Sequence, residues 1–424
     1  MKEDFLHYVW KLQLLNPEIL LSSINEPVII LKQGQHNSNE GPDFFNAKIK
    51  IGSQLWAGNV EIHVKSSDWY VHHHETDPNY DSVILHVVWE NDAEIFRADN
   101  TPIPTLVLKD YMATSVLNNY RNLLNKSEKW INCEKHIAEV DGFILNNWLE
   151  HLFIERLEQK AFLMTSLLKE TANDWEAVLF VLLAKNFGLK VNGEAFLNMA
   201  KSVDFNVVRK IRTNKQDLEA LFLGMGNLLD KAVDVNYYKT LKTQFDYLKV
   251  KFKLQPALTS KIQFFRLRPD NFPTIRLAQL AVLYSKHTNL FSLLIDVKKP
   301  EEIYKAFTVE ISDFWTSHYT FTSEKTGKRS KKLSKPFIDL LIINTIVPLQ
   351  FVYQKHIGKS NSEKIIGLLQ QIKPEKNSII TKFKTLGLSV ENAFTSQALL
   401  QLKNNYCAKN NCLHCKIGHN LIAN

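Results

Sequence analysis

The sequence predicts an α+β protein in which a small N-terminal α/β domain with a mixed sheet precedes a large all-α region. Runs of β-branched residues occur in roughly the first 110 residues, whereas amphipathic helical patterns fill the chain from about residue 140 onward. The charge changes at the same place. Residues 1–140 contain 12 Lys and Arg against 19 Asp and Glu, a net charge of −7, and the remainder carries +15. We therefore predict domains at 1–130 and 131–424, the second suited to a polyanionic partner.

The composition excludes several classes of protein. The 424 residues are 45% hydrophobic and 23% charged, which is typical of a globular protein and not of a disordered, collagen-like or disulfide-rich chain. The longest apolar stretch, 340–353, is shorter than the roughly 20 residues that span a bilayer. Two acidic residues close to the N-terminus argue against a secretion signal. We expect a cytoplasmic protein with no membrane partner.

The first domain is expected to combine short helices with five strands. Apolar residues follow a helical spacing within 2–15, and Asn16-Pro17 introduces a second short helix. Gly52-Ser53-Gln54 has the chemistry of a hairpin turn between two strands. Segment 66–81 has the length of a crossover that leads into a strand buried on both faces. The expected strands are 27–32, 44–51, 55–65, 82–89 and 103–108.

The second domain is expected to be helical, because apolar residues recur there at positions i, i+3, i+4 and i+7. No internal repeat period is evident, which argues against a solenoid. The expected helices are 143–168, 172–187, 216–229, 236–252, 273–284, 300–306, 339–354, 361–369 and 396–404.

The predicted hairpin carries the residues with the most chemical information. Side chains alternate along a strand, so Glu61, His63 and Lys65 share one face. Asp43 begins the preceding strand and is expected to lie near Glu61. Two carboxylates beside a base or cation suit a Mg²⁺ ion that supports phosphoryl transfer. We predict Asp43 and Glu61 as catalytic metal ligands with Lys65 or His63 assisting a water molecule, the alternative being the solvated face of a strand.

This arrangement resembles the PD-(D/E)xK nuclease superfamily, which includes restriction endonucleases and RecB-type nuclease modules. Pro42-Asp43 matches the "PD" of the motif, and the expected order of helix, strands, crossover and strand matches the core over about residues 1–110. The sequence departs from the motif in one respect, because His63 follows Glu61 where the superfamily has lysine, and Lys65 comes two residues later. The resemblance implies a restriction-endonuclease-like sheet and Mg²⁺-dependent hydrolysis of DNA.

Histidines downstream of the hairpin offer a different metal site. His72, His74 and His86 are of a type and spacing that could hold a transition metal, as an H-x-H element does in cupin-like sandwiches. The number of expected strands is too small for such a sandwich. We favour an interpretation in which His72 and His74 line the same cleft as Glu61 and His86 is a hydrogen-bonded core residue.

The cysteines form a second candidate metal centre. Cys407, Cys412 and Cys415 lie within nine residues of one another, and Cys133 stands at the junction of the two domains. Clustered thiolates suit zinc, or an iron–sulfur cluster if Cys133 supplies the fourth ligand. Such a metal would tie the C-terminal segment to the domain junction. The alternative is four ordinary thiols.

Two basic segments are candidates for nucleic-acid contacts. Three arginines flank a proline-punctuated turn that leads into a helix, and a Lys/Arg-rich loop follows at 325–335. Arginines paired with nearby carboxylates, and a merely solvated loop, are the alternatives. The predicted nucleic-acid-binding residues are Arg266, Arg268, Arg276, Lys328, Arg329, Lys331 and Lys332.

Segments spread over the whole chain, among them RLRPDNFPTIRLAQLA and YCAKNNCLHCKIG, are similar to an uncharacterised bacterial family of unknown function. That resemblance implies one architectural unit and no particular activity. The sequence therefore predicts a Mg²⁺-dependent nuclease that cleaves DNA. The alternatives are a non-catalytic nucleic-acid-binding or scaffold protein with a metal-bound C-terminus, and a histidine-ligated metalloprotein.

Overall fold

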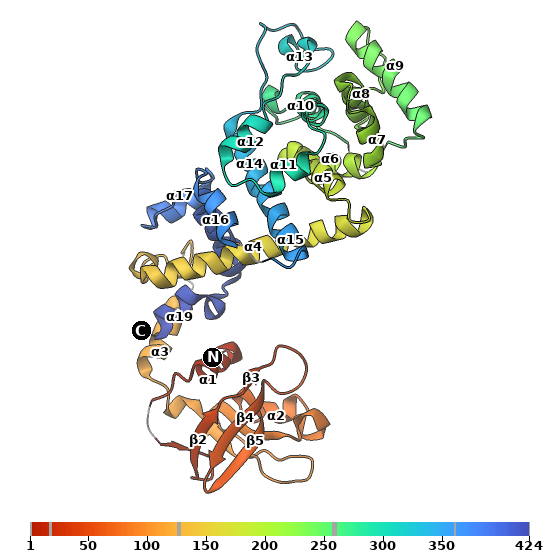
Figure 1. The fold of residues 1–424 in the computed structure, drawn as a ribbon. Helices are drawn as coiled ribbons and strands as arrows, with labels where there is room; N and C mark the ends of the chain where they lie inside the picture. Colours follow the sequence, from red (N-terminus) through yellow and green to blue (C-terminus); the bar gives the residue numbers. More distant parts are fainter. Residues whose placement is uncertain (1, 17–18, 125–128, 257–260, 360–361, 424) are drawn as a thin grey trace. The chain divides into compact units, whose positions relative to one another are not determined.

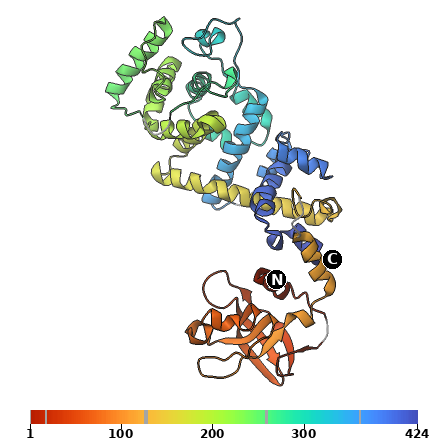
Figure 2. The same cartoon turned by 180° about the vertical axis from the view of Figure 1, so that it is seen from behind.

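The computed structural model describes residues 2–16, 19–124, 129–256, 261–359 and 362–423 and contains two compact units (Figures 1 and 2). The first comprises 1–149, 382–388 and 401–424, and the second comprises 150–381 and 389–400. The chain therefore returns to the first unit after the helical one, which the predicted division at residue 130 does not describe.

A mixed sheet forms the centre of the first unit, as predicted. Its strands follow the order β1-β2-β4-β5-β6-β7, with β3 paired to β4. The strands up to β5 pair antiparallel, and β6 runs parallel to both β5 and β7. The strands are β1 (Leu20–Leu21), β2 (Pro27–Lys32), β3 (Gln35–His36), β4 (Phe44–Ile51), β5 (Gln54–Lys65), β6 (Val83–Glu90) and β7 (Thr105–Val107).

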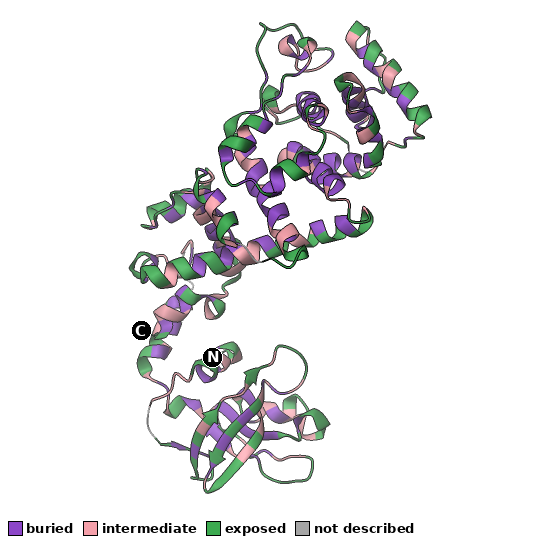
Figure 3. Ribbon diagram, viewed as in Figure 1, coloured by how far each residue is buried: buried purple, intermediate pink, exposed green. Residues whose placement is uncertain are grey.

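Burial explains why the strands take these places. β6 is buried from Val83 to Val88, which fits its continuous apolar sequence and a position between two parallel neighbours. In Figure 3 the buried residues concentrate on the inner strands. Most residues of β2 are exposed, and Val28 is the one that is buried. The parallel pairing of β5 and β6 requires a crossover, which is built from the short helix α2 (Asp68–Val71) and two 3₁₀ turns.

Three helices of the first unit come from distant parts of the sequence. They are α1 (Glu3–Leu12), α3 (Thr114–Leu124) and α19 (Lys416–Ala423). Figures 1 and 2 both show α19 beside α3. The Phe5 ring stacks on Tyr120 with centroids 3.9 Å apart, and the Tyr8 hydroxyl donates to the His419 carbonyl at 3.3 Å. These contacts join both ends of the sequence in one core.

Position 58 requires glycine because β5 lies very close there to Ser82 and to Ile84 at the start of β6. A Cβ atom at this position would lie 2.4 Å from Ile84 Cγ2 and 2.5 Å from the Ser82 carbonyl oxygen. We expect Gly58→Ala to lower the free energy of unfolding by about 1–3 kcal/mol, since neither neighbour can move without disturbing the sheet. Urea unfolding measures the loss. Gly142→Ala is the matched control, because its Cβ would meet no atom within 4 Å, and equal stability of the two variants would contradict the prediction.

The second unit is helical. α10 is buried from Pro273 to Tyr284, and Asp174 caps α5 while it forms a bidentate ion pair with Arg209. The long helix α4 is Gly142–Glu170. The other helices, including two that end in the first unit, are α5 (Trp175–Phe187), α6 (Leu189–Lys201), α7 (Phe205–Ile211), α8 (Lys215–Met225), α9 (Asn236–Lys251), α10 (Pro273–Lys286), α11 (Leu290–Ile295), α12 (Pro300–Ala306), α13 (Asp313–Ser317), α14 (Lys335–Leu341), α15 (Val347–His356), α16 (Ser362–Gln370), α17 (Ser378–Thr385) and α18 (Ala393–Gln401).

One helical segment of the described chain is long and apolar enough to cross a membrane. A π-helical turn at Ile342–Ile346 joins α14 to α15 into one continuous helix of 22 residues. This helix is longer than the apolar stretch 340–353 in the sequence. Of its apolar window, 67% is buried inside the protein. This burial is typical of a core helix of a soluble protein and agrees with the expectation of no membrane span.

Candidate functional site

A β-bulge places Asp43 beside Glu61. Phe44 pairs with Val60, whereas Ala47 pairs with Gly58, so one extra residue is accommodated in β4. Asn46 takes a left-handed conformation with φ of 56° there, and its N–H donates to Asn59 Oδ1 at 3.1 Å. Because Phe44 faces Val60, the preceding Asp43 lies next to Glu61. Bulges commonly redirect side chains at functional sites. This bulge brings Asp43 next to Glu61, which is the proximity that the sequence predicts.

The two carboxylates each accept a hydrogen bond from the other strand. The Asp43 N–H donates to Glu61 Oε2 at 3.1 Å, and the Ile62 N–H donates to Asp43 Oδ2 at 3.0 Å. His7 of α1 also reaches this point, with Nε2 3.1 Å from Asp43 Oδ2. Glu61 is 4% exposed, whereas Asp43 is only partly covered. The pair is therefore held at defined positions, with Asp43 on the accessible side.

Histidines surround the second oxygen of Glu61. Glu61 Oε1 lies 3.5 Å from His63 Nε2 and 3.4 Å from His74 Nε2. His63 Nε2 is 3.1 Å from His72 Nδ1, and its other ring nitrogen, Nδ1, is 2.8 Å from His86 Nε2. Glu61 thus separates the Asp43 side of the site from a cluster of imidazoles.

Burial controls the charge of these groups in the absence of a cation. Burial, together with the charge of Asp43, raises the pKa of Glu61 to about 9. Burial and the neighbouring His74 and His72 lower the pKa of His63 to about 3. Burial likewise holds the pKa of His86 well below its usual range. For His7, burial lowers the pKa, but the hydrogen bond and charge of Asp43 outweigh it and raise the pKa overall. Neutral imidazoles such as those of His63 and His86 have lone pairs and no positive charge to repel a metal.

The structure brings three of the four predicted catalytic residues together. Asp43, Glu61 and His63 converge, whereas Lys65 is half exposed at the end of β5 with Nζ 3.9 Å from Asp92 Oδ2. The histidines are grouped differently from the predicted set of 72, 74 and 86. His86 faces only His63 within the cluster and is completely buried, as expected of a core histidine.

Sequence reasoning missed His7. Its position on α1, 36 residues before Asp43, gives no signal in a strand-based motif. Glu3 lies one helical turn before it, with Oε1 3.9 Å from His7 Nε2, and this polar i, i+4 pair is the signal that could have found it.

The four cysteines also come together in the first unit. Cys133 and Cys415 are buried, and burial together with the other thiols of the group raises the pKa of Cys133 far above its usual range. Burial raises the pKa of Cys407 to about 12. Asn132 Nδ2 donates to Cys412 Sγ at 3.3 Å, and Cys415 accepts from the N–H groups of two following residues and from the Trp148 indole. Donors aimed at sulfur are typical of metal-bound thiolates.

The predicted nucleic-acid-binding residues have unequal access to the surface. Arg266 and Arg268 are exposed. Arg276 is 6% exposed, donates to Gln279 and Asn271, and stacks over Phe337. Lys331 is 5% exposed and donates to the Trp315 and His318 carbonyls. These two buried cations hold the loop in place and leave no surface for a phosphate.

The rest of the basic loop is partly neutralised. Lys328 lies 3.2 Å from Asp313, Lys332 lies 3.6 Å from Glu310, and Arg329 pairs with Asp270. These side chains remain exposed, and exposed ion pairs of this kind are weak, about 0–1 kcal/mol, so they can exchange a carboxylate for a phosphate.

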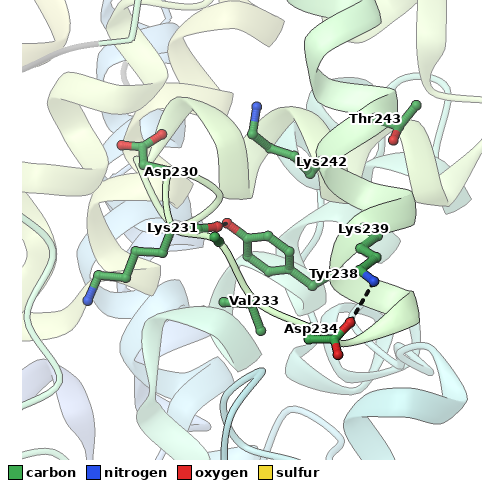
Figure 4. A pocket seen from close by; sticks show the side chains of 9 residues that line it. Asp230, Lys231, Val233, Asp234, Tyr238, Lys239, Lys242 and Thr243 are labelled. Atoms are coloured by element: carbon green, nitrogen blue, oxygen red, sulfur yellow. Dashed lines mark hydrogen bonds and ion pairs between the residues drawn. The ribbon is translucent and has the colours of Figure 1, made fainter.

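The helical unit also contains a surface hollow of about 560 Å³ (Figure 4). Tyr238 lies across it and donates to the Lys231 carbonyl, while Lys239 Nζ pairs with Asp234 Oδ1 at 2.6 Å. None of the residues predicted from the sequence lines this hollow. It is therefore separate from the candidate site on the sheet.

Comparison with known proteins gives a family and no activity. No curated protein and no solved structure shows a significant match to the chain. A family model described as a protein of unknown function, DUF2851, matches residues 3–378, a range that contains the sheet, the carboxylates, the histidines and nearly all of the helical unit. On this match the chain belongs to the DUF2851 family.

Proposed function

We propose that the protein is a Mg²⁺-dependent nuclease that hydrolyses DNA phosphodiester bonds in the cytoplasm. The observation that supports this best is the bulge in β4, which sets Asp43 next to Glu61 on a mixed sheet that follows a helix. Paired carboxylates from neighbouring strands are what a hard divalent cation requires. The resemblance of this hairpin to the PD-(D/E)xK motif points in the same direction.

The residues present fit a magnesium site. Asp43 and Glu61 would hold the ion, which when bound supplies charge stabilisation and lowers the pKa of a water molecule. His7, within hydrogen-bond distance of Asp43, would orient the water or the phosphate on the accessible side. His63 is a less direct candidate because its ring is fully buried, and Lys65 would have to leave Asp92 to take part.

The partner is expected to be DNA because of the charge of the chain. Residues 141–424 carry a net charge of +15. Arg266 and Arg268 are exposed, and neither forms an ion pair with another residue that the structure describes, unlike Lys328 and Arg329 of the neighbouring loop. Arg329, Lys328 and Lys332 would join them by exchanging their carboxylate partners for phosphates.

We also propose that the cysteines hold an iron–sulfur cluster, not zinc. Corners of a tetrahedral zinc–thiolate site lie about 3.8 Å apart, from Zn–S bonds of about 2.3 Å. Among the described residues, the histidines form the one group of three ligand atoms that all lie within 4.8 Å of one another, so the sulfur atoms are more widely spaced. A larger cluster with Cys133, Cys407, Cys412 and Cys415 as ligands suits that spacing.

The nuclease proposal is tested with the full-length protein on single- and double-stranded DNA, with and without Mg²⁺. We expect Mg²⁺-dependent cleavage that falls by ~10²-fold or more in Asp43→Asn and in Glu61→Gln, because each removes a ligand charge. Asp110→Asn and Glu90→Gln are matched controls at exposed positions of the same unit.

Equal cleavage of DNA by the variants and the wild type, or no cleavage by any of them, would contradict the proposal. DNA binding that persists without Mg²⁺ and in Glu61→Gln, with a steep dependence on salt, would instead identify a non-catalytic nucleic-acid-binding protein.

A further inference from the structure

The imidazoles beside Glu61 form a group of their own. His63, His72 and His74 each offer a ring nitrogen, and the three ligand atoms lie within 4.8 Å of one another. Glu61 Oε1 lies 3.5 Å and 3.4 Å from the Nε2 atoms of His63 and His74. Three imidazole nitrogens therefore converge on one point, and Glu61 Oε1 lies beside two of them.

The spacing of these atoms matches a coordination sphere. With metal–nitrogen bonds of about 2.1 Å, ligands at the corners of a tetrahedron lie about 3.4 Å apart. The separations of 3.1 Å between His63 and His72, 3.5 Å between Glu61 and His63, and 3.4 Å between Glu61 and His74 all lie close to that value. A single ion at the centre would replace these three polar contacts between the side chains.

Neighbouring residues hold the rings in place. His63 Nδ1 lies 2.8 Å from His86 Nε2, so the nitrogen that does not face the cluster has a hydrogen-bond partner, as is usual for a metal-ligating histidine. The His74 ring stacks on Tyr80 with centroids 3.7 Å apart, and buried Trp69 contacts the edges of His74 and His86. Only His72 is exposed, which leaves one route for an ion to enter.

We propose that His63, His72, His74 and Glu61 bind a first-row transition-metal ion of the Zn²⁺ or Mn²⁺ type. Three imidazoles and one carboxylate select such ions over Mg²⁺, which prefers oxygen ligands. Glu61 also faces Asp43 through Oε2, so its carboxylate would bridge this ion and the Mg²⁺ of the proposed nuclease. The bridging role rests on the proposed function, whereas ion binding by the histidines does not.

Mn²⁺ is the probe that separates this site from the cysteines, because soft thiolates favour other metals. Chelator-treated full-length protein is titrated with Mn²⁺ without DNA, and free Mn²⁺ is read from its electron paramagnetic resonance signal. We expect binding that excess Mg²⁺ does not displace. His72→Asn and His74→Asn should each weaken it by at least about 10-fold.

His73→Asn is the matched control, because His73 lies between the two ligands, is exposed, and keeps a left-handed φ of 58° that Asn tolerates. The proposal is overturned if the wild type does not bind Mn²⁺, or if His72→Asn and His74→Asn bind it as tightly as His73→Asn does. Histidine-dependent binding without DNA cleavage would refute the nuclease alone. DNA cleavage that His72→Asn and His74→Asn leave unchanged would refute the bridging role alone.

Discussion

Cys415→Ser should detach the C-terminal segment of the first unit and lower the melting temperature of that unit by on the order of 10 °C. The serine hydroxyl is a poor replacement for a buried thiolate that accepts three N–H donors. Cys133 and Cys415 are 282 positions apart, so a shared cluster removes much of the entropy of the unfolded chain. The loss of stability should be large because the binding free energy of a structural metal adds directly to the free energy of folding.

Three measurements check this prediction: thermal unfolding, iron and zinc content, and absorbance at about 400 nm, where an iron–sulfur cluster absorbs and zinc does not. His414→Ala is the matched control, since His414 is the exposed neighbour of Cys415. The same melting temperature and metal content in Cys415→Ser and in the wild type would refute a metal at the cysteines. A colourless protein that contains zinc would refute the iron–sulfur assignment only.

Glu219→Ala should cost about 3–5 kcal/mol in the helical unit, which is roughly 10 °C in melting temperature. Glu219 of α8 is 3% exposed, and its Oε1 accepts from the Trp315 indole at 2.6 Å and from the Tyr237 hydroxyl at 2.8 Å. Those donors come from α13 and α9, so one carboxyl group joins three helices. Alanine would leave the Trp315 indole N–H buried without its acceptor, and Tyr237 would keep only the hydrogen bond to Ser312 Oγ at 2.7 Å.

The Glu219→Gln variant distinguishes the contribution of the hydrogen bonds to stability from the contribution of the charge. Burial raises the pKa of Glu219, so between the unfolded and folded pKa values the folded state binds more protons and its stability falls as the pH rises. Glutamine keeps the acceptor, and its variant should unfold close to the wild type at low pH and lack this fall. Urea unfolding across the pH range gives both results. A loss for Glu219→Gln as large as for Glu219→Ala would contradict this account.

The sequence predicts most of the sheet and the longer helices, because their hydrophobic periodicity is strong. β4 lies at the expected residues 44–51, and α12 at the expected 300–306. The helix expected after Asn16-Pro17 begins outside the described residues, and β1 follows directly at Leu20–Leu21. Among the helices, α2, α3, α6, α7, α11, α13, α17 and α19 were not predicted. All of them except α3 and α6 have eight residues or fewer and carry little periodic signal.

The candidate site also has a part that the sequence predicts and a part that it does not. Strand alternation and one hairpin turn, which are local properties, predict that Asp43 and Glu61 lie near each other. The exact pairing of the two residues also requires the β-bulge in β4, which the sequence does not indicate. The meeting of His63 with His72 and His74 depends on how a crossover folds back on the sheet, and the contribution of His7 depends on where α1 packs. Both contacts depend on tertiary structure, which the spacing of residues in the sequence does not indicate.

The segments that form the first unit also set an order of events during synthesis. Residues 150–381, nearly the whole helical unit, leave the ribosome before the stretch at 401–424 that carries three of the four cysteines and α19. At about 5–20 residues per second, the sheet would wait tens of seconds for its last partners while the helices fold. A nascent chain therefore holds Asp43 and Glu61 long before their unit is complete, so the unit that carries the candidate site is begun first and completed last.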